Sequence, residues 1–312
     1  MTELAMLAMQ VVRIHDYGGL EALVLEEAPQ PEPPSGQVLV RLKAAGVNPA
    51  DTAFRRGAFK QFMSLQFPWT PGLEGAGVVE AVGPDVASFR PGQEVYGFLT
   101  GAYAQYALGK ANDLQPKPSN LTMDEAASAP MGATMAWAAV IETAKVEEGQ
   151  SVLIHGAAGG IGSYATQLAR WKNAYVIGTT SAENLKTARS LGADLAADYL
   201  ESPFEAVVRD VDVVIDTVGG DVLERSWAVI RPGGILVTVA GRVSADAGKA
   251  QGIRAASVMR PAFGDHTQIS ELLAAKTIVP TIRAVFPLAE AGAAQALSET
   301  RHGRGRIVLQ IP

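Results

Sequence analysis

A glycine-rich turn at residues 156–162 has the residue types and the spacing of a phosphate-binding loop. The strand-like run 151–155 leads directly into it, and a helical stretch follows. Against the pattern G-x-G-x-x-G, positions 157, 159 and 162 align, with Ala157 in place of the first glycine. A glycine at 159 lets backbone N–H groups approach a pyrophosphate, and the helix start adds partial positive charge. A tight turn without a ligand is the plainer alternative. The residues expected to hold the diphosphate of a dinucleotide are Ala158, Gly159, Gly160, Ile161 and Gly162.

The end of the following strand indicates which dinucleotide the turn would hold. A site for NAD usually carries Asp or Glu there, about 20 residues after the glycines, to bind the ribose 2′-hydroxyl. The strand expected at 175–179 instead runs into Thr180 and Ser181, and Lys186 follows in the next helix. These hydroxyls and this cation suit a 2′-phosphate, whereas Glu183 fits a first-turn residue stabilised by the helix dipole. We therefore predict NADPH rather than NADH.

The composition excludes several other classes of function. The chain has no Cys, which removes disulfides, thiol nucleophiles and zinc sites built on thiolates. Its 26 Lys and Arg against 32 Asp and Glu give a net charge of −6, so nucleic acids and anionic membranes are poor partners. No apolar run reaches the ~20 residues of a membrane span, and residues 1–8 lack the basic start of a signal peptide. We expect a cytoplasmic protein with a small-molecule substrate, and a loosely ordered extension at residues 1–8.

The order of strand and helix patterns divides the chain into two regions. Short strand-like runs cut by Gly and Pro fill residues 9–128, with a hairpin turn expected at 16–19, and this texture indicates a β-barrel or sandwich. From about residue 150, strands and helices alternate, including a helix at 222–230 closed by Pro-Gly-Gly. Such alternation indicates a parallel sheet with crossover helices. Residues 280–311 return to strand-like runs and are expected to rejoin the first region.

Six segments, taken in their order along the chain, resemble one family. They read GVNPADT at 46–52, PGLEGAG at 71–77, GAYAQY at 101–106, HGAAGGIG at 155–162, DTVGG at 216–220 and GRIVL at 305–309. Together they resemble the zinc-free branch of the medium-chain dehydrogenases/reductases, the NADPH:quinone oxidoreductase (zeta-crystallin-like) group. The resemblance implies an α/β fold in which a GroES-like β-barrel catalytic domain carries an inserted Rossmann domain with a doubly wound parallel sheet. It also implies a homodimer and an active site in the cleft between the domains. The expected boundaries are 1–128 and 274–312 for the GroES-like domain and 129–273 for the Rossmann domain.

Leu73 stands where zinc-dependent relatives in the same superfamily carry a His that binds the metal. Leucine has no ligand atom, and the absence of Cys removes the other catalytic ligand and the structural zinc site. Without a Lewis acid a simple alcohol is hard to activate. The resemblance therefore implies an acceptor whose π-system takes up the incoming charge, either a quinone or an α,β-unsaturated carbonyl. NADPH would carry the hydride and the protein would position it.

The resemblance also carries over to individual positions. Asn48 matches the Asn beside the nicotinamide and the substrate, although a turn residue before Pro49 is a plainer explanation. Asp51 and Arg55 are candidate catalytic residues, and their spacing also fits an i,i+4 surface pair. Thr134 is the candidate contact to the nicotinamide. The residues expected beside the nicotinamide ribose, at the carboxyl ends of later strands, are Val218, Gly219, Ala240 and Gly241.

Two tyrosines that many relatives carry are missing here. Ala53 stands at one position, and the other would lie near Phe59. We therefore expect water or the cofactor ribose to supply the proton. Two alternatives stay open: an enoyl or 2-alkenal double-bond reductase with little quinone activity, and a non-catalytic NADPH-binding protein with a structural or sensory role. His155 is expected to be a packed structural residue, and the basic cluster 301–306 a solvated turn or a phosphate contact.

Overall fold

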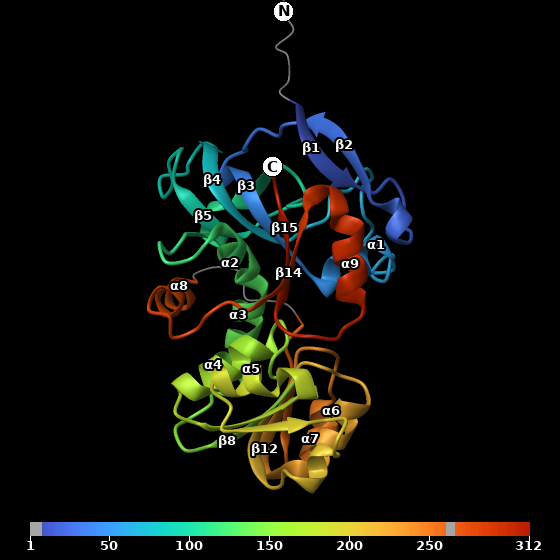
Figure 1. Cartoon of the computed structure of the whole chain (residues 1–312), viewed down its shortest axis with the longest axis vertical. Coiled ribbons are helices and arrows are strands. Elements are labelled where there is room, and N and C mark those ends of the chain that lie inside the picture. Colours follow the sequence, from blue (N-terminus) through green and yellow to red (C-terminus); the bar gives the residue numbers. More distant parts are fainter. Residues whose placement is uncertain (1–7, 260–265) are drawn as a thin grey trace, which may run out of the picture.

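A computed structural model describes residues 8–259 and 266–312 of the chain (Figure 1). Two β-sheet regions follow one another along the long axis of the molecule, and helices α2 (Met123–Ser128) and α3 (Pro130–Trp137) run between them. Most of the extension expected at residues 1–8 lies outside the described residues. Within the described ranges, no helix has the length and the apolar character that crossing a membrane requires.

The first sheet combines segments from both ends of the chain. Its strand order is β14-β15-β3-β4-β5-β7, with β6 paired to β3. Strand β15 pairs antiparallel with β3, so that Ile307 lies opposite Val47. The prediction that the C-terminal segment rejoins the first region is therefore confirmed, while the exact domain boundaries stay a prediction. The strands are β3 (Gln37–Val47), β4 (Glu74–Val82), β5 (Glu94–Phe98), β6 (Tyr106–Lys110), β7 (Leu114–Pro116), β14 (Ile282–Pro287) and β15 (Arg306–Gln310).

Strands β1 (Ala8–Arg13) and β2 (Val24–Pro29) form a separate antiparallel hairpin. The tight hairpin turn expected at 16–19 is wrong, because Arg13 pairs with Val24 and the connection between the strands is longer. Part of that connection, Leu20–Ala22, forms a 3-10 turn. The Glu21 carboxylate stabilises this connection by accepting the N–H of Gly19 at 2.8 Å.

The second sheet has six strands, all parallel, in the order β10-β9-β8-β11-β12-β13. Its central strands are runs of Val, Leu and Ile that are buried on both faces, as a sheet covered by helices requires. The strand order reverses at β8, which lies between β9 and β11, and ligands bind at such a switch point. The strands are β8 (Ser151–His155), β9 (Tyr175–Thr180), β10 (Leu195–Asp198), β11 (Val211–Asp216), β12 (Ile230–Thr238) and β13 (Arg254–Ser257). The helices that follow strands of this sheet are α4 (Gly162–Trp171), α5 (Leu185–Ser190), α6 (Asp221–Arg225) and α7 (Ala245–Ala250).

The helix predicted at 222–230 is shorter than expected. Helix α6 ends at Arg225, a 3-10 turn covers Ser226–Val229, and β12 begins at once with Ile230. The Pro-Gly-Gly segment that was expected to close the helix lies inside β12. The strand accommodates it with an irregularity in its pairing to β11 and with a positive φ of 81° at Gly233.

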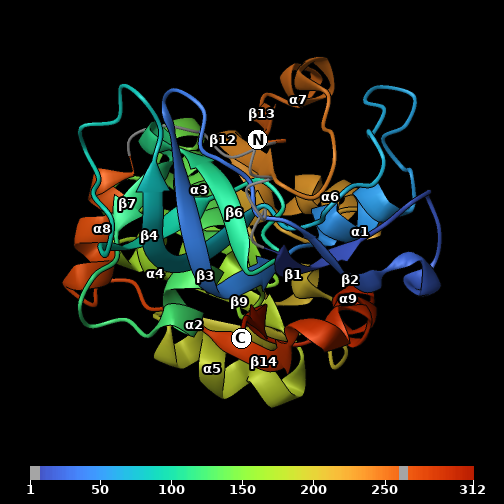
Figure 2. The same ribbon diagram turned by 90° about the horizontal axis from the view of Figure 1, so that it is seen from above.

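The C-terminal segment also contains a helix that its strand-like pattern did not predict. Helix α9 (Ala291–Glu299) is rich in Ala, which has the highest helix propensity, and its residues Ala291 and Ala294 are buried in the core of the first sheet. It packs beside helix α1 (Pro49–Arg55), and Figure 2 shows the two helices on the same side of the barrel. A further helix, α8 (Thr267–Ala274), contacts α3.

A single buried apolar cluster joins the two sheets. It includes Ala44 and Val308 from the first sheet, Ala133 from α3, and Tyr164 from α4. Gly132 makes this contact close, because a Cβ there would lie 2.8 Å from the Tyr164 ring. The two sheets therefore share a core where α3 crosses α4, and the polar residues described below lie beside this junction.

Candidate active site

The glycine-rich turn connects the end of β8 to the start of α4. Gly156 has a φ of +71°, which glycine adopts without strain, and a Cβ at Gly162 would clash with the Gly156 carbonyl. A Cβ at Gly159 would lie 3.1 Å from the same carbonyl. Gly159, Gly160 and Ile161 are partly exposed at the N-terminal end of α4, where negative charge is stabilised. This cradle fits the diphosphate of a dinucleotide.

Two of the residues predicted to hold a 2′-phosphate, Thr180 and Ser181, follow the strand beside this turn. The third, Lys186, lies in helix α5. Strand β9 pairs with β8, and the Ala157 N–H donates to the Thr179 carbonyl at 3.0 Å. Thr180 ends β9 and is buried, and Ser181 follows it. The side chain of Asn184 donates to Ser181 Oγ at 2.9 Å and so fixes that hydroxyl. Lys186 is exposed on α5.

The residues expected near the nicotinamide ribose follow the carboxyl ends of β11 and β12. The carboxylate of Asp216 organises the first pair, because it accepts the N–H of Val218 at 3.0 Å and of Gly219 at 2.9 Å. It also accepts the hydroxyl of Thr238, in β12, at 2.7 Å. A Cβ at Gly219 would lie 2.8 Å from the Ala240 carbonyl, so the structure brings 218–219 and 240–241 together.

His155, at the end of β8, is a structural residue, as the sequence analysis expected. Its side chain is fully buried, with Nδ1 3.0 Å from the Thr179 hydroxyl and Nε2 3.1 Å from the Ser226 hydroxyl. The Phe204 ring packs edge-on against it at 4.6 Å. Burial lowers the pKa of His155 to about 4, so the imidazole is neutral at pH 7.

Strand register brings three polar side chains together where three adjacent strands of the first sheet begin or end. Strand β3 ends at Val47, opposite Ile307, so Asn48 and Arg306 are neighbours there. Gly46 lies beside the first residue of β4, and a Cβ on Gly46 would clash with the Glu74 carboxylate. Glu74 therefore occupies the space that Gly46 leaves open.

These three residues form a buried hydrogen-bonded cluster, hereafter the Glu74 cluster. Asn48 Nδ2 donates to Glu74 Oε1 at 2.8 Å, and Arg306 Nη2 donates to Asn48 Oδ1 at 2.7 Å. Arg306 is also ion-paired to Glu74. The other carboxylate oxygen, Glu74 Oε2, accepts the N–H of Met131 at the start of α3, at 2.7 Å. Glu74 and Asn48 are at most 1% exposed and Arg306 is 5% exposed, so each of the two charges is buried beside its counter-charge.

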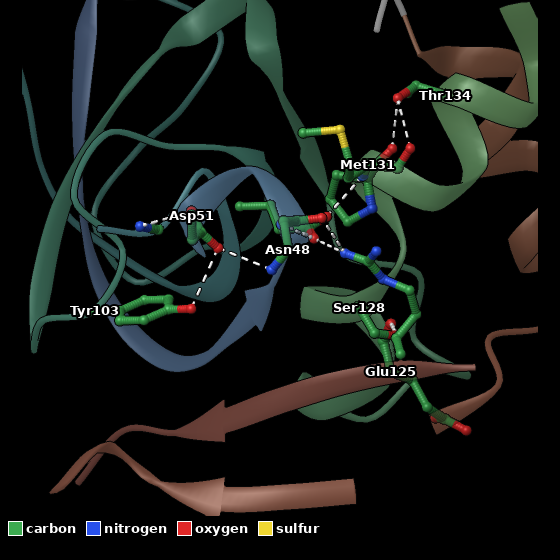
Figure 3. Close-up of polar contacts among 11 residues, drawn as sticks. Asn48, Asp51, Tyr103, Glu125, Ser128, Met131 and Thr134 are labelled. Atoms are coloured by element: carbon green, nitrogen blue, oxygen red, sulfur yellow. Dashed lines mark hydrogen bonds and ion pairs between the residues drawn. The ribbon is translucent and has the colours of Figure 1, made fainter. Parts of the chain in front are cut away.

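Asp51 lies behind Asn48, and Figure 3 shows its carboxyl group between Asn48 and Tyr103. Its Oδ2 accepts the Asn48 N–H at 2.8 Å and the Tyr103 hydroxyl at 3.3 Å, and its Oδ1 accepts the Gly72 N–H at 3.2 Å. Burial raises the pKa of Asp51 to about 7; the charge of Glu74 adds to this rise, while the backbone donors oppose it. Burial also raises the pKa of Tyr103, and the Asp51 charge raises it further, so Tyr103 stays a donor.

Arg55 lies away from these groups. Its guanidinium donates to Gln295 Oε1 at 2.8 Å, to the Gly18 carbonyl at 2.7 Å and to Glu299 Oε1 at 2.5 Å. These contacts join α1 to α9. The alternative of an i,i+4 surface pair with Asp51 is wrong, because both side chains are fully buried and each has its own partners. The structure thus brings Asn48 and Asp51 together and leaves Arg55 outside the site.

Thr134 faces its own helix, as Figure 3 shows. Its hydroxyl donates to the Pro130 carbonyl at 2.7 Å, one turn earlier in α3, and the residue is 2% exposed. The same helix begins beside Glu74 through Met131, so Thr134 is one turn beyond the Glu74 cluster.

Arg306 links the Glu74 cluster to the glycine turn. The adjacent Gly305 donates its N–H to the Ala158 carbonyl at 2.8 Å, and a Cβ at Gly160 would lie 3.1 Å from Arg306 Cδ. Sequence reasoning missed Glu74 as a site residue and considered Arg306 only within the basic cluster 301–306, although both lie in the quoted segments. Their opposite charges between glycines and apolar strand residues were the available signal. Of the basic cluster 301–306, Arg306 is buried, while Arg301, His302 and Arg304 are exposed in the turn that precedes β15.

A metal centre needs several ligand side chains close together. Leu73, between Gly72 and Glu74, has no ligand atom. Across residues 8–259 and 266–312, no group of three or more His, Cys, Asp or Glu side chains is arranged to hold a metal ion.

Comparison with known proteins adds family information to this geometry. A family model described as alcohol dehydrogenase GroES-like domain matches residues 34–119, and one described as zinc-binding dehydrogenase matches residues 191–309. The chain is 31% identical to a quinone oxidoreductase of Mus musculus over 96% of each chain. It is also 31% identical to an NADPH-dependent alkenal/one oxidoreductase, chloroplastic, of Arabidopsis thaliana, over 94% of this chain and 77% of that one. Its structure is similar to that of the quinone oxidoreductase from Coxiella burnetii, with a TM-score of 0.90, 30% sequence identity, and coverage of 98% of this chain and 100% of the other.

Proposed function

The chain belongs to the quinone oxidoreductase family of the medium-chain dehydrogenases/reductases, and from this premise we propose that it uses NADPH to reduce quinones or α,β-unsaturated carbonyls without a metal ion. Members of this family are NAD(P)-dependent reductases of the quinone and alkenal reductase type, and this chain is one of them. The observation that carries the proposal is the hydrogen bond from the Gly305 N–H to the Ala158 carbonyl. Gly305 precedes Arg306, so this bond joins the buried Glu74 cluster to the glycine turn.

The residues at the positions of possible metal ligands support an acceptor that needs no Lewis acid. Leu73 offers no ligand atom, and the chain has no Cys. An alcohol or an isolated carbonyl depends on a metal or a strong acid to stabilise the charge that develops on its oxygen. A quinone or an enone spreads that charge over its own conjugated system. Two relatives carry the names of such acceptors, a quinone oxidoreductase and an alkenal/one oxidoreductase.

The residues of the chain divide the work of binding and orienting. The backbone of 158–162 would hold the diphosphate, and the segments 218–219 and 240–241 would flank the nicotinamide ribose. The bound cofactor supplies the hydride. Asn48, held by Glu74 and Arg306, would present its fixed amide to the acceptor or the nicotinamide. Burial of these groups keeps water away from them and strengthens their electrostatic effect.

NADPH is proposed over NADH because the end of β9 presents hydroxyls and no acid. Thr180 and Ser181 lie next to the turn, and Lys186 is an exposed cation on the next helix. The test is the thermal unfolding midpoint with each reduced nucleotide at equal concentration. A ligand at 100 times its Kd adds about 2.7 kcal/mol to the free energy of unfolding. Equal or greater stabilisation by NADH would refute the preference.

The proposed reaction is tested with a panel of acceptors, with NADPH oxidation followed by absorbance. The panel contains 9,10-phenanthrenequinone and benzoquinones on one side, and 2-alkenals and enones on the other. Turnover on the quinones supports the proposal as stated. Turnover confined to the alkenals would favour the double-bond reductase, and NADPH binding without turnover on any acceptor would favour the non-catalytic role. Preparation in the presence of a chelator should leave the rate unchanged, and a zinc requirement would contradict the metal-free reaction.

A further inference from the structure

Asp51 is a buried acid whose hydrogen-bond partners are all donors. The backbone N–H groups of Asn48 and Gly72 and the hydroxyl of Tyr103 point at its two oxygens, at distances of 2.8 to 3.3 Å. A carboxylate accepts all three, because it has only acceptor sites. A protonated carboxyl group must place its own hydrogen against one of these donors. Only the Tyr103 hydroxyl can turn to receive it, since the direction of a backbone N–H is fixed.

The two backbone partners belong to the segments that carry the Glu74 cluster. Asn48 follows β3, and Gly72 stands two residues before Glu74 at the start of β4. Gly72 has a φ of +102°, and a Cβ there would lie 2.7 Å from the Tyr103 ring, so the segment lies close to both Asp51 and Tyr103. The carboxylate of Asp51 thus sets the spacing between the backbones that position Asn48 and Glu74.

We propose that Asp51 is a positioning residue for the reduction: its charged carboxylate holds the Asn48 and Gly72 backbones in the arrangement that the acceptor meets, and its protonation weakens that hold. This inference rests on the proposed function. Asp51 is fully buried, so it would act through Asn48, whose N–H it accepts, and not by contact with the cofactor or the acceptor.

The charged surroundings of Asp51 place this change near neutral pH. Glu74 faces it from β4, and Arg306 of β15 pairs with Glu74. Tyr103 faces it from the segment before β6. On the packed helices, Arg55 of α1 and Glu299 of α9 pair with each other. No cation pairs directly with Asp51 among the described residues, so burial and the Glu74 charge prevail and raise the pKa of Asp51 to about 7.

The kinetic test compares Asp51→Asn with the wild type across pH 5.5 to 9. In the wild type, kcat should fall as pH drops through about 7, because the carboxylate form is lost. In Asp51→Asn the acid-side fall should be absent, and kcat at pH 8 should be lower by roughly tenfold to a hundredfold, as for a misplaced reacting group. The KM for NADPH should change little, because the glycine turn makes no contact with Asp51. Parallel pH profiles for the two proteins would overturn the proposal.

A matched variant, Tyr103→Phe, removes one hydroxyl and keeps the ring that packs on Gly72. The Tyr103 hydrogen bond lowers the pKa of Asp51, so its loss should move the acid-side fall of kcat to higher pH. A residue that only supports the fold would lower the amount of active enzyme without moving the profile. An unmoved profile in Tyr103→Phe therefore contradicts the inference, even if Asp51→Asn fails to fold.

An activity-independent measurement keeps this inference separate from the proposed function. In the NMR spectrum of the isotopically labelled full chain, the amide signals of Asn48 and Gly72 should titrate together with a midpoint near pH 7. The midpoint should rise in Tyr103→Phe, and the titration should vanish in Asp51→Asn. If the wild type reduces no acceptor but these amides titrate, the proposed function fails and the hold by Asp51 stands. If the amides do not titrate, the inference fails whatever the enzyme reduces.

Discussion

The glycine turn and the Glu74 cluster meet at Arg306, but they are built in opposite ways. The turn is one contiguous segment, and its glycines at 159 and 162 stand where an added Cβ would meet neighbouring backbone. The cluster consists of side chains that lie 26 and 232 positions from Glu74 in the chain, and strand register brings them together. The turn should therefore tolerate changes of charge nearby and fail when volume is added. The cluster should tolerate changes of volume better than the loss of one charge.

The largest effect expected from this contrast is on stability when one charge of the cluster is removed. Glu74→Gln leaves Arg306 buried without its counter-charge, and breaking a buried pair in this way costs about 3–5 kcal/mol. The free energy of unfolding in urea measures the loss. The control is Glu80→Gln, which breaks the pair of Glu80 with Arg41; both side chains are about 40% exposed, so the cost should stay below about 1 kcal/mol.

The double variant Glu74→Gln, Arg306→Met sharpens the same point. With both charges gone, no uncompensated charge is buried, so part of the stability lost in the single variant should return. NADPH binding should remain weaker than in the wild type, because Arg306 also packs against Gly160. The single variants Glu74→Gln and Arg306→Met are measured beside the double variant. If their losses of unfolding free energy simply add in the double variant, the cluster does not act as a unit.

Asp51 should make the stability of the wild type fall with rising pH. The folded pKa of Asp51 is about 7, above its ordinary value of 3.8, so the folded state binds the proton more tightly than the unfolded state. The stability that this group contributes is fully present below about pH 4 and is lost as pH rises through 7, about 4 kcal/mol in all. Asp51→Asn cannot ionise, so its unfolding free energy relative to the wild type should rise between pH 5 and pH 8. Parallel pH dependences in urea titrations would contradict this.

The stability and rate effects of Asp51 therefore have opposite signs. Ionisation of Asp51 lowers the free energy of unfolding. The ionised carboxylate is nevertheless the form that accepts all three hydrogen bonds and would hold the Asn48 and Gly72 backbones. The pH range in which Asp51 contributes most to stability is therefore not the range in which kcat should be highest. The comparison of the two pH profiles, one of stability and one of kcat, tests whether a single titration underlies both.

Added volume should be the more damaging change in the glycine turn. In Gly162→Ala, the new methyl group clashes with the Gly156 carbonyl, and such overpacking costs about 1–3 kcal/mol. NADPH binding should weaken at least about tenfold, because the backbone that faces the diphosphate must shift. The matched control is Gly292→Ala in α9, where a Cβ meets nothing within 4 Å. It should gain about 0.5–1 kcal/mol from helix propensity and bind NADPH as the wild type does.

The contrast also explains what the sequence could predict. The turn, the parallel sheet and the hydroxyl residues at the end of β9 follow from local patterns, because a strand, a turn and a helix are encoded by consecutive residues. The Glu74 cluster depends on the pairing of β3 with β15 and β4, which no local pattern encodes. Arg55 illustrates the limit: its spacing from Asp51 indicates a neighbour on the same helix, but its partner Gln295 lies 240 positions further along the chain. The helix at 291–299 was missed because the strand-like runs on either side dominated the pattern.

The smallest expected effect lies at the edge of the cofactor site, at Lys186. This cation is exposed, so its attraction to a 2′-phosphate is screened by solvent and salt, and its removal should cost about 1 kcal/mol or less of NADPH binding free energy. Lys186→Ala should therefore weaken NADPH severalfold at low ionic strength and leave NADH unchanged, as titration of protein fluorescence with each nucleotide would measure. Arg189→Ala removes an exposed cation in the last turn of the same helix and serves as the control for net charge. If Arg189→Ala weakens NADPH as much as Lys186→Ala does, the effect is a general one of surface charge, and the 2′-phosphate must be held by Thr180 and Ser181 alone.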